Sequence, residues 1–125
     1  IRFVDLPGYG YAQVSFKEKK RWSELVEGYF EKDRNIKLII QIIDVRHPAS
    51  ALDMQMIEFL SSQNFPFIIV ASKCDKLNKT NRQMREKMME KELSSYEDIP
   101  RIIFSSQTGE GIEKIKNIIS DYCDN

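Results

Sequence analysis

The chain has 125 residues, of which 42% are hydrophobic and 30% charged, and this size and composition fit one globular domain, 1–125. Lysine plus arginine and aspartate plus glutamate both number 19, so no overall charge favours nucleic acid or an anionic membrane as a partner. No apolar run reaches the roughly 20 residues needed to span a bilayer, and Cys74 and Cys123 lack the spacing of metal ligands.

Four short apolar runs predict the strands of a parallel sheet. They are rich in Ile, Val and Phe and are nearly continuous, as in strands that are buried on both faces. In chain order they are IRFV (1–4), LIIQIIDV (38–45), FPFIIVAS (65–72) and RIIFSS (101–106). Because the chain opens on Ile1 without an initiator methionine, we expect a fragment that begins inside a strand.

Helical periodicity between and after these runs predicts four helices. Ser15 with Glu18 forms a capping box for the first helix, and Ser50 with Asp53 opens the second. The third is predicted over about 81–96, and the fourth follows the last glycine. The predicted apolar faces are, in order, Trp22, Leu25, Val26, Tyr29 and Phe30; Leu52, Met56, Phe59 and Leu60; Met84, Met88 and Leu93; and Ile112, Ile115, Ile118, Ile119 and Tyr122.

Strands and helices alternate along the chain, which predicts a doubly wound α/β domain with right-handed crossovers. In such a sheet, ligands bind beyond the carboxyl ends of the strands. Polar, loop-forming segments follow every predicted strand at that edge: DLPGYG (5–10), DVRHPAS (44–50), SKCDKL (72–77) and SSQTGEG (105–111). A ligand site is therefore expected where these four segments converge.

The segment SKCD, 72–75, suits the recognition of guanine. The carboxylate of Asp75 could accept hydrogen bonds from N1–H and the 2-amino group of the base, both of which adenine lacks. The stem of Lys73 could lie on the purine face. In the later loop the backbone N–H of Ser106 could donate to guanine O6, although by itself an ordinary β–α turn explains that loop better.

The opening loop suits a metal and a phosphate. Asp5 ends a strand where a carboxylate can hold Mg²⁺ through water. Gly8 can bring its N–H against a terminal phosphate, and Gly10 can act as a hinge. A loop that a γ-phosphate orders and hydrolysis releases is a known type of switch. A simple Pro-Gly turn is the alternative.

These motifs stand in the order and spacing of the third, fourth and fifth GTP-binding motifs of P-loop GTPases. The segments VDLPGYGYA, WSELVEGYF, IIDVRHPAS, MIEFL and VASKCDKL resemble the EngB (YihA/YsxC) family of ribosome-biogenesis GTPases along essentially the whole chain. The resemblance implies a Ras-like three-layer α/β/α fold with a mostly parallel sheet, GTP or GDP as ligand, Mg²⁺ as cofactor and hydrolysis of GTP to GDP. It also implies assembly of the large ribosomal subunit and contact with its RNA, links to the cell cycle and septation, a monomer, and a cytoplasmic location with an organelle as the alternative.

Carried over by position, the residues that serve the phosphates and Mg²⁺ are Asp5, Leu6, Pro7 and Gly8, with Asp5 acting on the metal through water. The residues that serve guanine are Ser72, Lys73, Asp75, Lys76, Ser105, Ser106 and Gln107. Ser72 departs from the usual asparagine of this motif and from the threonine that the family tends to use. Tyr9 occupies the place of the glutamine that commonly orients the attacking water, so no catalytic residue is assigned and slow intrinsic hydrolysis is expected.

The phosphate loop G-x-x-x-x-G-K-[ST] is absent from the chain, since none of the five glycines is followed by lysine. In the family that loop, the first switch and a central strand precede the residue aligned with Ile1. We therefore expect a partial G domain, inactive by itself. The alternative is a degenerate GTPase fold that binds the ribosome or RNA without hydrolysing nucleotide. A receiver-like phosphoacceptor domain built on Asp44 is a weaker alternative.

For several other polar residues we expect structural or solvated positions rather than catalytic roles. His47 is expected to be a loop residue bonded to a backbone carbonyl rather than a catalytic group. Arg46 is expected to pair with a carboxylate or to reach ribosomal RNA, and Cys74 to pack in the interior. Four basic residues of the third helix are expected to be solvated, with an RNA contact as the alternative: Arg82, Arg85, Lys87 and Lys91.

Overall fold

The computed structural model describes Phe3, Glu24, Gly28 and residues 36–123. Contacts divide the chain into two units, Ile1–Ile36 and Lys37–Asn125. In the first unit Glu24 and Gly28 are helical, in agreement with the first predicted helix. The predicted strand at 1–4 lies outside the described residues except for Phe3, as does the capping box at Ser15.

The second unit contains one parallel sheet. Its strands lie in the order β1-β2-β3, so strands that follow one another along the chain are neighbours in the sheet. The strands are β1 (Ile39–Asp44), β2 (Phe67–Ser72) and β3 (Arg101–Ile103). All three match predicted runs, but β3 is shorter than its run because the chain leaves the sheet after Ile103.

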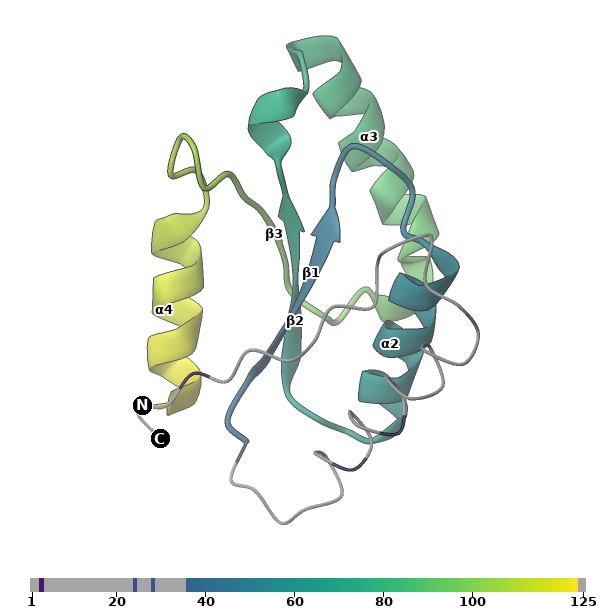
Figure 1. The fold of residues 1–125 in the computed structure, drawn as a ribbon, viewed down its shortest axis with the longest axis vertical. Coiled ribbons are helices and arrows are strands. Elements are labelled where there is room, and N and C mark those ends of the chain that lie inside the picture. Colours follow the sequence, from purple (N-terminus) through teal and green to yellow (C-terminus); the bar gives the residue numbers. More distant parts are fainter. Residues whose placement is uncertain (1–2, 4–23, 25–27, 29–35, 124–125) are drawn as a thin grey trace. The chain divides into compact units, whose positions relative to one another are not determined.

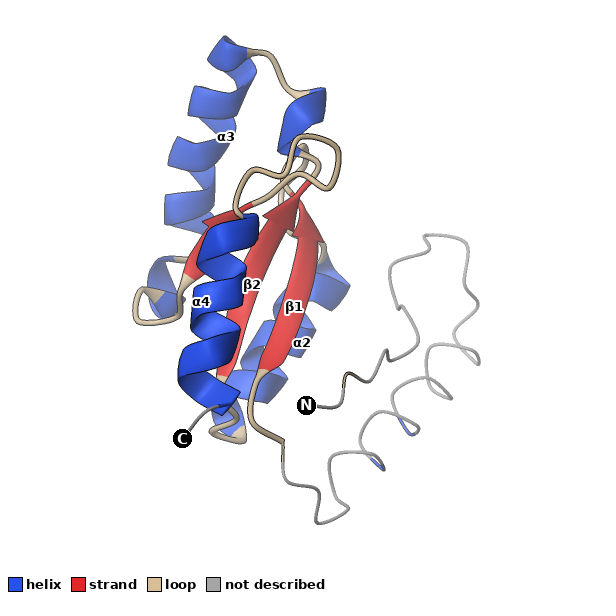
Figure 2. Ribbon diagram, turned by 90° about the vertical axis from the view of Figure 1, so that its left-hand side faces the viewer, coloured by secondary structure: helices blue, strands red, loops and turns tan. Residues whose placement is uncertain are grey.

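Helices cover both faces of this sheet. In the two views α4 lies on one face, whereas α2 and α3 lie on the other (Figure 1, Figure 2). The helices are α2 (Ala51–Ser62), α3 (Lys79–Glu92) and α4 (Ile112–Cys123), with two short 3₁₀ helices, η1 (Cys74–Lys76) and η2 (Ser94–Tyr96). The predicted three-layer α/β/α arrangement is therefore present. None of the helices within the described residues is long and apolar enough to cross a membrane.

β2 forms the centre of the sheet and is buried from Phe67 to Ala71, as its continuous apolar run predicts. β1 departs from that expectation, since Ile42 is 62% exposed. The difference arises because β1 is an edge strand of the described sheet. Among the described strands, continuous burial on both faces therefore holds for β2 alone, from Phe67 to Ala71.

The cap of α2 and part of the apolar faces of α2 and α4 match the sequence pattern; on α2, Leu60 is buried as predicted, and Ile57 is buried although it was not predicted. Ser50 and Asp53 form the capping box that opens α2, each side chain accepting from the backbone N–H of the other residue. On α4, Ile115 and Ile118 pack against the core formed by Ile68, Val70 and Ile102. Tyr122, predicted on the same face, is instead 37% exposed.

The predicted inward face of α3 is wrong by one residue. Met84 and Met88 are exposed, whereas Arg85 and Met89 are buried; Leu93 is buried as predicted. The reason is that Arg85 turns inward to backbone carbonyls, as described below, and thereby sets the rotation of the helix. The predicted solvated position of Arg85 is corrected by the same observation.

Candidate functional site

The carboxyl ends of the three strands lie at one edge of the sheet, and the loops that follow them gather there (Figure 2). Residue by residue, Asp44 pairs with Ser72 in the β1–β2 register, and Ala71 pairs with Ile103 in the β2–β3 register. The segments that begin at 44, 72 and 105 are therefore neighbours, as the sequence predicts for parallel strands.

Ser72 and Lys73 carry the chain out of β2. The Ser72 hydroxyl donates to the Ile43 carbonyl at 3.1 Å, and the Ser72 carbonyl accepts from the Val45 N–H at 3.0 Å. Ser72 thus joins the end of β2 to the end of β1, and the bond from its side chain needs only a hydroxyl group. Lys73 then adopts the left-handed conformation, with φ 67° and ψ 30°, and turns the chain into η1.

Asp75 is held by a residue from the other loop. The Ser105 hydroxyl donates to Asp75 Oδ1 at 2.8 Å, and the Ser105 side chain is fully buried. Asp75 Oδ2 lies 3.9 Å from the ammonium group of Lys76. A carboxylate offers about four acceptor positions, so Asp75 keeps capacity for the two donors of a guanine edge. The structure brings Asp75 and Ser105 together, as their predicted common role requires.

The loop from Ser105 to Gly111 is folded around that same hydroxyl. Ser105 Oγ accepts from the backbone N–H groups of Gln107 and Thr108, each at 3.1 Å. Ser106 is exposed and forms no hydrogen bond with the other described residues. Gly111 has φ 88°, and a Cβ there would lie 2.4 Å from the Ile103 carbonyl oxygen. Only glycine therefore fits where this loop returns against β3.

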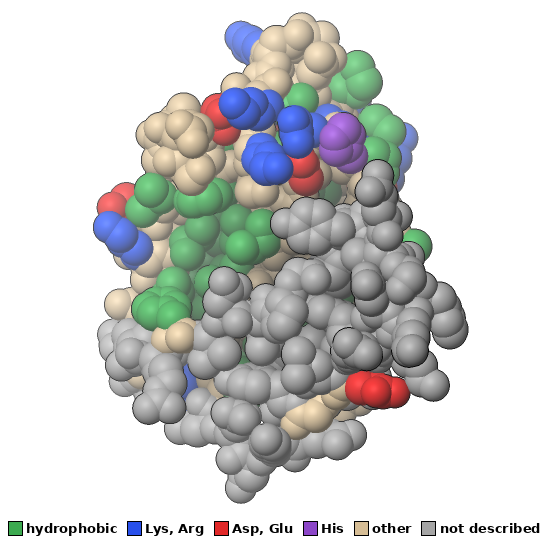
Figure 3. Space-filling view, viewed as in Figure 1, with side chains coloured by type: hydrophobic (Ala, Val, Ile, Leu, Met, Phe, Trp, Pro, Cys, Tyr) green, Lys and Arg blue, Asp and Glu red, His purple; other side chains and the backbone are tan. Residues whose placement is uncertain are grey.

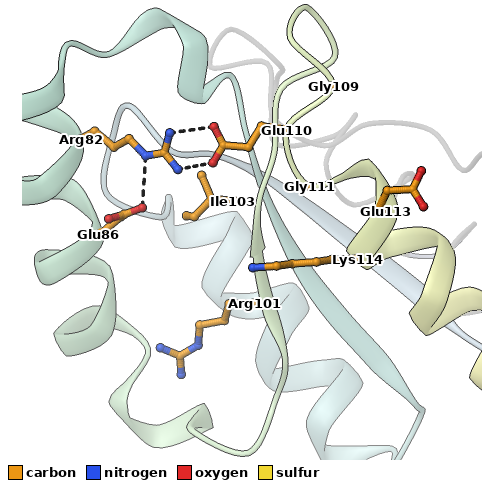
Figure 4. Close-up of a pocket in the computed structure, with 9 residues that line it drawn as sticks. All are labelled: Arg82, Glu86, Arg101, Ile103, Gly109, Glu110, Gly111, Glu113 and Lys114. Carbon is orange, nitrogen blue, oxygen red and sulfur yellow. Dashed lines mark hydrogen bonds and ion pairs between the residues drawn. The ribbon is translucent and has the colours of Figure 1, made fainter.

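Glu110 connects the two loops to α3. Its carboxylate accepts two hydrogen bonds from the guanidinium of Arg82, which also pairs with Glu86 (Figure 4). Cys74 Sγ lies 3.6 Å from Glu110 Oε1, and the Cys74 N–H donates to the Phe104 carbonyl at 3.2 Å. The pairing with Arg82 lowers the pKa of Glu110. Arg82 is thus a bridge between elements rather than a solvated cation.

Cys74 packs in the interior, as expected. The side chain is 3% exposed, and burial raises the pKa of its thiol. Because the thiolate is the reactive form, a raised pKa makes this cysteine a poor nucleophile although it stands between Lys73 and Asp75.

A pocket of about 410 Å³ is lined in part by the Arg82–Glu110 pair (Figure 4). Its walls come from α3, β3, the last loop and the start of α4. The lining residues are Arg82, Glu86, Arg101, Ile103, Gly109, Glu110, Gly111, Glu113 and Lys114. None of the predicted guanine-contacting residues belongs to it, so the candidate site is the strand edge and not this pocket.

Two arginines hold the segment after β1: the expected pairing of Arg46 with a carboxylate is confirmed, whereas the contacts of Arg85 are not among the predicted ones. The Arg46 guanidinium donates to both oxygens of the Asp44 carboxylate, from Nε to Oδ1 at 3.0 Å and from Nη2 to Oδ2 at 2.8 Å. Arg85 donates to the carbonyls of Val45 and His47 at 2.9 and 2.7 Å. His47 lies in a loop, as expected, but its side chain is exposed and forms no hydrogen bond to a backbone carbonyl of the described residues; its own carbonyl accepts from Arg85 instead.

The residues predicted to serve the phosphates and the metal lie outside the described residues. These are Asp5, Leu6, Pro7 and Gly8, and Tyr9 lies there too. Within the part of the chain that the structure describes, no group of three or more His, Cys, Asp or Glu side chains could hold a metal ion. The described part of the candidate site is therefore the part that is predicted to contact the base.

Known proteins resemble this chain in sequence along most of its length. A family model described as ferrous iron transport protein B matches residues 1–119. Relatives named "Probable GTP-binding protein EngB" come from Pelotomaculum thermopropionicum, 39% identical over 119 residues, and Thermotoga petrophila, 43% identical over 118 residues. The chain belongs to the family of that model, and proteins named EngB are its relatives in sequence. The resemblance recognised in the sequence is confirmed.

Coverage of these relatives is unequal. The two alignments include 95% and 94% of this chain but 60% of each relative, so the chain spans about 60% of their length. A crystal structure of a probable GTP-binding protein EngB superposes with a TM-score of 0.75 at 21% identity, over 94% of this chain and 75% of the other.

The translation elongation factor SelB of Methanococcus maripaludis superposes with a TM-score of 0.59 at 25% identity, over 72% of this chain and 20% of the other. With the parallel sheet and its helices, these likenesses establish the α/β fold of P-loop GTPases.

Proposed function

We propose that the chain is the guanine-recognition part of a GTP-binding protein that hydrolyses GTP to GDP. The observation that carries the proposal is the hydrogen bond from Ser105 to Asp75, which joins the two loops predicted to surround the base. It fixes one carboxylate oxygen and leaves acceptor capacity for N1–H and the 2-amino group of guanine. The names of the EngB relatives support the same ligand.

The finer parts of the proposal rest on family membership. Asp5 would hold Mg²⁺ through water, and Gly8 would donate to the γ-phosphate. With Tyr9 in place of the usual glutamine, hydrolysis would be slow until another group or the ribosome completes the site. We further propose a cytoplasmic monomer that acts in assembly of the large ribosomal subunit and contacts its RNA.

Guanine selectivity of the full-length protein tests the proposal. Displacement of a fluorescent GDP analogue should require at least about 100 times more ADP than GDP, because adenine leaves Asp75 without its donors. Asp75→Asn should lose GDP affinity and gain affinity for XDP, since an amide can pair with the 2-oxo group of xanthine.

Asp98→Asn is the matched control. It makes the same chemical change on an exposed side chain in the turn before β3, away from the strand ends that carry the site. Equal displacement by GDP and ADP in the wild type would refute guanine recognition. Unchanged selectivity in Asp75→Asn would refute the role of Asp75.

A further inference from the structure

The segment Asp44–Pro48 has no role in the function proposed above, yet it is fixed in place from α3. Arg85 is 8% exposed and donates to the Val45 and His47 carbonyls. The charge of Arg85 is balanced by Glu92, whose carboxylate lies 3.0 Å from Nη1. Each of the three guanidinium nitrogens of Arg85 donates a hydrogen bond, and a buried cation bonded in this way holds the loop in one conformation.

Asp44 is the acidic group of this segment. Besides the three side-chain bonds from Arg46, Oδ1 accepts from the Arg46 backbone N–H at 3.0 Å. Two parallel bonds from a planar guanidinium fix both the position and the orientation of a carboxylate. The hydrogen bonds from Arg46 lower the pKa of Asp44 to about 2, so the group is charged at neutral pH.

The fixed carboxylate also meets Lys73. Lys73 Nζ lies 3.7 Å from Asp44 Oδ2, and the β1–β2 register, which pairs Asp44 with Ser72, places the two residues at adjacent strand ends. Figure 3 shows lysine and arginine side chains gathered with acidic ones at this end of the second unit. The backbone of Lys73 is in the left-handed conformation, which is strained for a residue other than glycine. Its side chain is 55% exposed, so within the described part of the chain little besides Asp44 restrains the ammonium group.

We propose that Asp44 is a positioning residue for guanine recognition: it holds the Lys73 ammonium so that the lysine stem lies ready on the purine face. The inference rests on the proposed function. A lysine side chain loses much rotamer freedom when it is held, and a carboxylate that restrains it beforehand reduces that loss on binding. Arg46 and Arg85 act one step further away, because they fix the carboxylate and its loop.

The test is a double-mutant cycle on the rate at which a fluorescent GDP analogue leaves the full-length protein. Asp44→Asn keeps the shape of the side chain and removes its charge, and Lys73→Met keeps the stem and removes the ammonium. Asp44→Asn should dissociate about two to five times faster than wild type, the range of a partly exposed ion pair. In the Lys73→Met background the same change should have no further effect. Asp98→Asn should behave as wild type.

The possible outcomes distinguish a failure of guanine recognition from a failure of the positioning role of Asp44. If wild type releases GDP and ADP analogues equally fast, the proposed function fails and the inference falls with it. If wild type is selective but Asp44→Asn matches Asp98→Asn, or is equally damaging with Met at 73, only the inference is overturned. Should Asp44→Asn not fold because Arg46 loses its partner, Asp44→Asn/Arg46→Met removes both members of the pair. That variant should show the same faster release, again abolished by Lys73→Met.

Discussion

At the scale of single residues, the Ser105 hydroxyl serves three hydrogen bonds at once. It donates to Asp75 and accepts from the N–H groups of Gln107 and Thr108, all within a fully buried position. The same atom therefore orients the predicted base-reading carboxylate and closes the loop beside it. Stability and recognition are linked at this residue.

Ser105→Ala should destabilise the full-length protein by about 1–3 kcal/mol, because two backbone donors in partly buried hydrogen bonds lose their partner. GDP affinity should fall as well, since Asp75 is no longer oriented. Urea unfolding and GDP titration measure the two effects. Ser120→Ala, an exposed serine on α4, is the control. If both variants unfold at the same urea concentration, the bonds to Ser105 contribute nothing measurable.

At the scale of elements, α3 is rotated by a polar side chain rather than by its methionines. Arg85 reaches the loop after β1, Arg82 reaches the loop after β3, and Met89 is buried. The helix thus contacts the loops that follow β1 and β3 and has a marked inner and outer side.

The adjacent residues Met88 and Met89 test that rotation. Met89 is 5% exposed and Met88 is 43% exposed. Met89→Ala should lower the free energy of unfolding by about 2–5 kcal/mol through lost burial and a cavity. Met88→Ala should stay within about 0.5 kcal/mol of wild type. Thermal or urea unfolding measures both, and equal losses would mean that the helix face is wrongly placed.

The same helix shows what a sequence can and cannot predict. Continuous apolar runs marked the strands, and parallel pairing then brought Asp75 and Ser105 to one edge without further information. On α3 any of three methionines could lie on the inner face, so the apolar pattern did not determine how the helix is rotated about its axis. It was decided by hydrogen bonds from Arg85 to carbonyls about 40 residues earlier, and periodicity within one helix carries no signal of such contacts.

At the scale of the whole molecule, the formal net charge is zero at pH 7, so local pairs and not overall repulsion set the initial response to acid. Among the described residues two carboxyl groups have a lowered pKa, Glu110 through Arg82 and Asp44 through Arg46. Both pairs connect an acidic group at the candidate site with an arginine.

Acid should remove the contribution of Asp44 in a defined range. The unfolded chain takes up this proton near the ordinary pKa of 3.8, whereas the folded chain takes it up near about 2. The stabilisation, at most about 2 kcal/mol, is therefore complete above the first value and disappears as pH falls through the second. The gap in unfolding free energy between wild type and Asp44→Asn should be full at about pH 6 and mostly lost by about pH 2.5. A gap independent of pH would contradict this.

Lys73 has a consequence for how such a protein can be altered. Its φ of 67° lies in the region that glycine enters freely and that costs other residues about 1 kcal/mol. A redesign guided by thermostability alone would therefore place glycine at this position and discard the ammonium group that meets Asp44. The chain stores a small amount of conformational energy at the residue proposed to touch the ligand, so robustness and recognition are traded against each other at position 73.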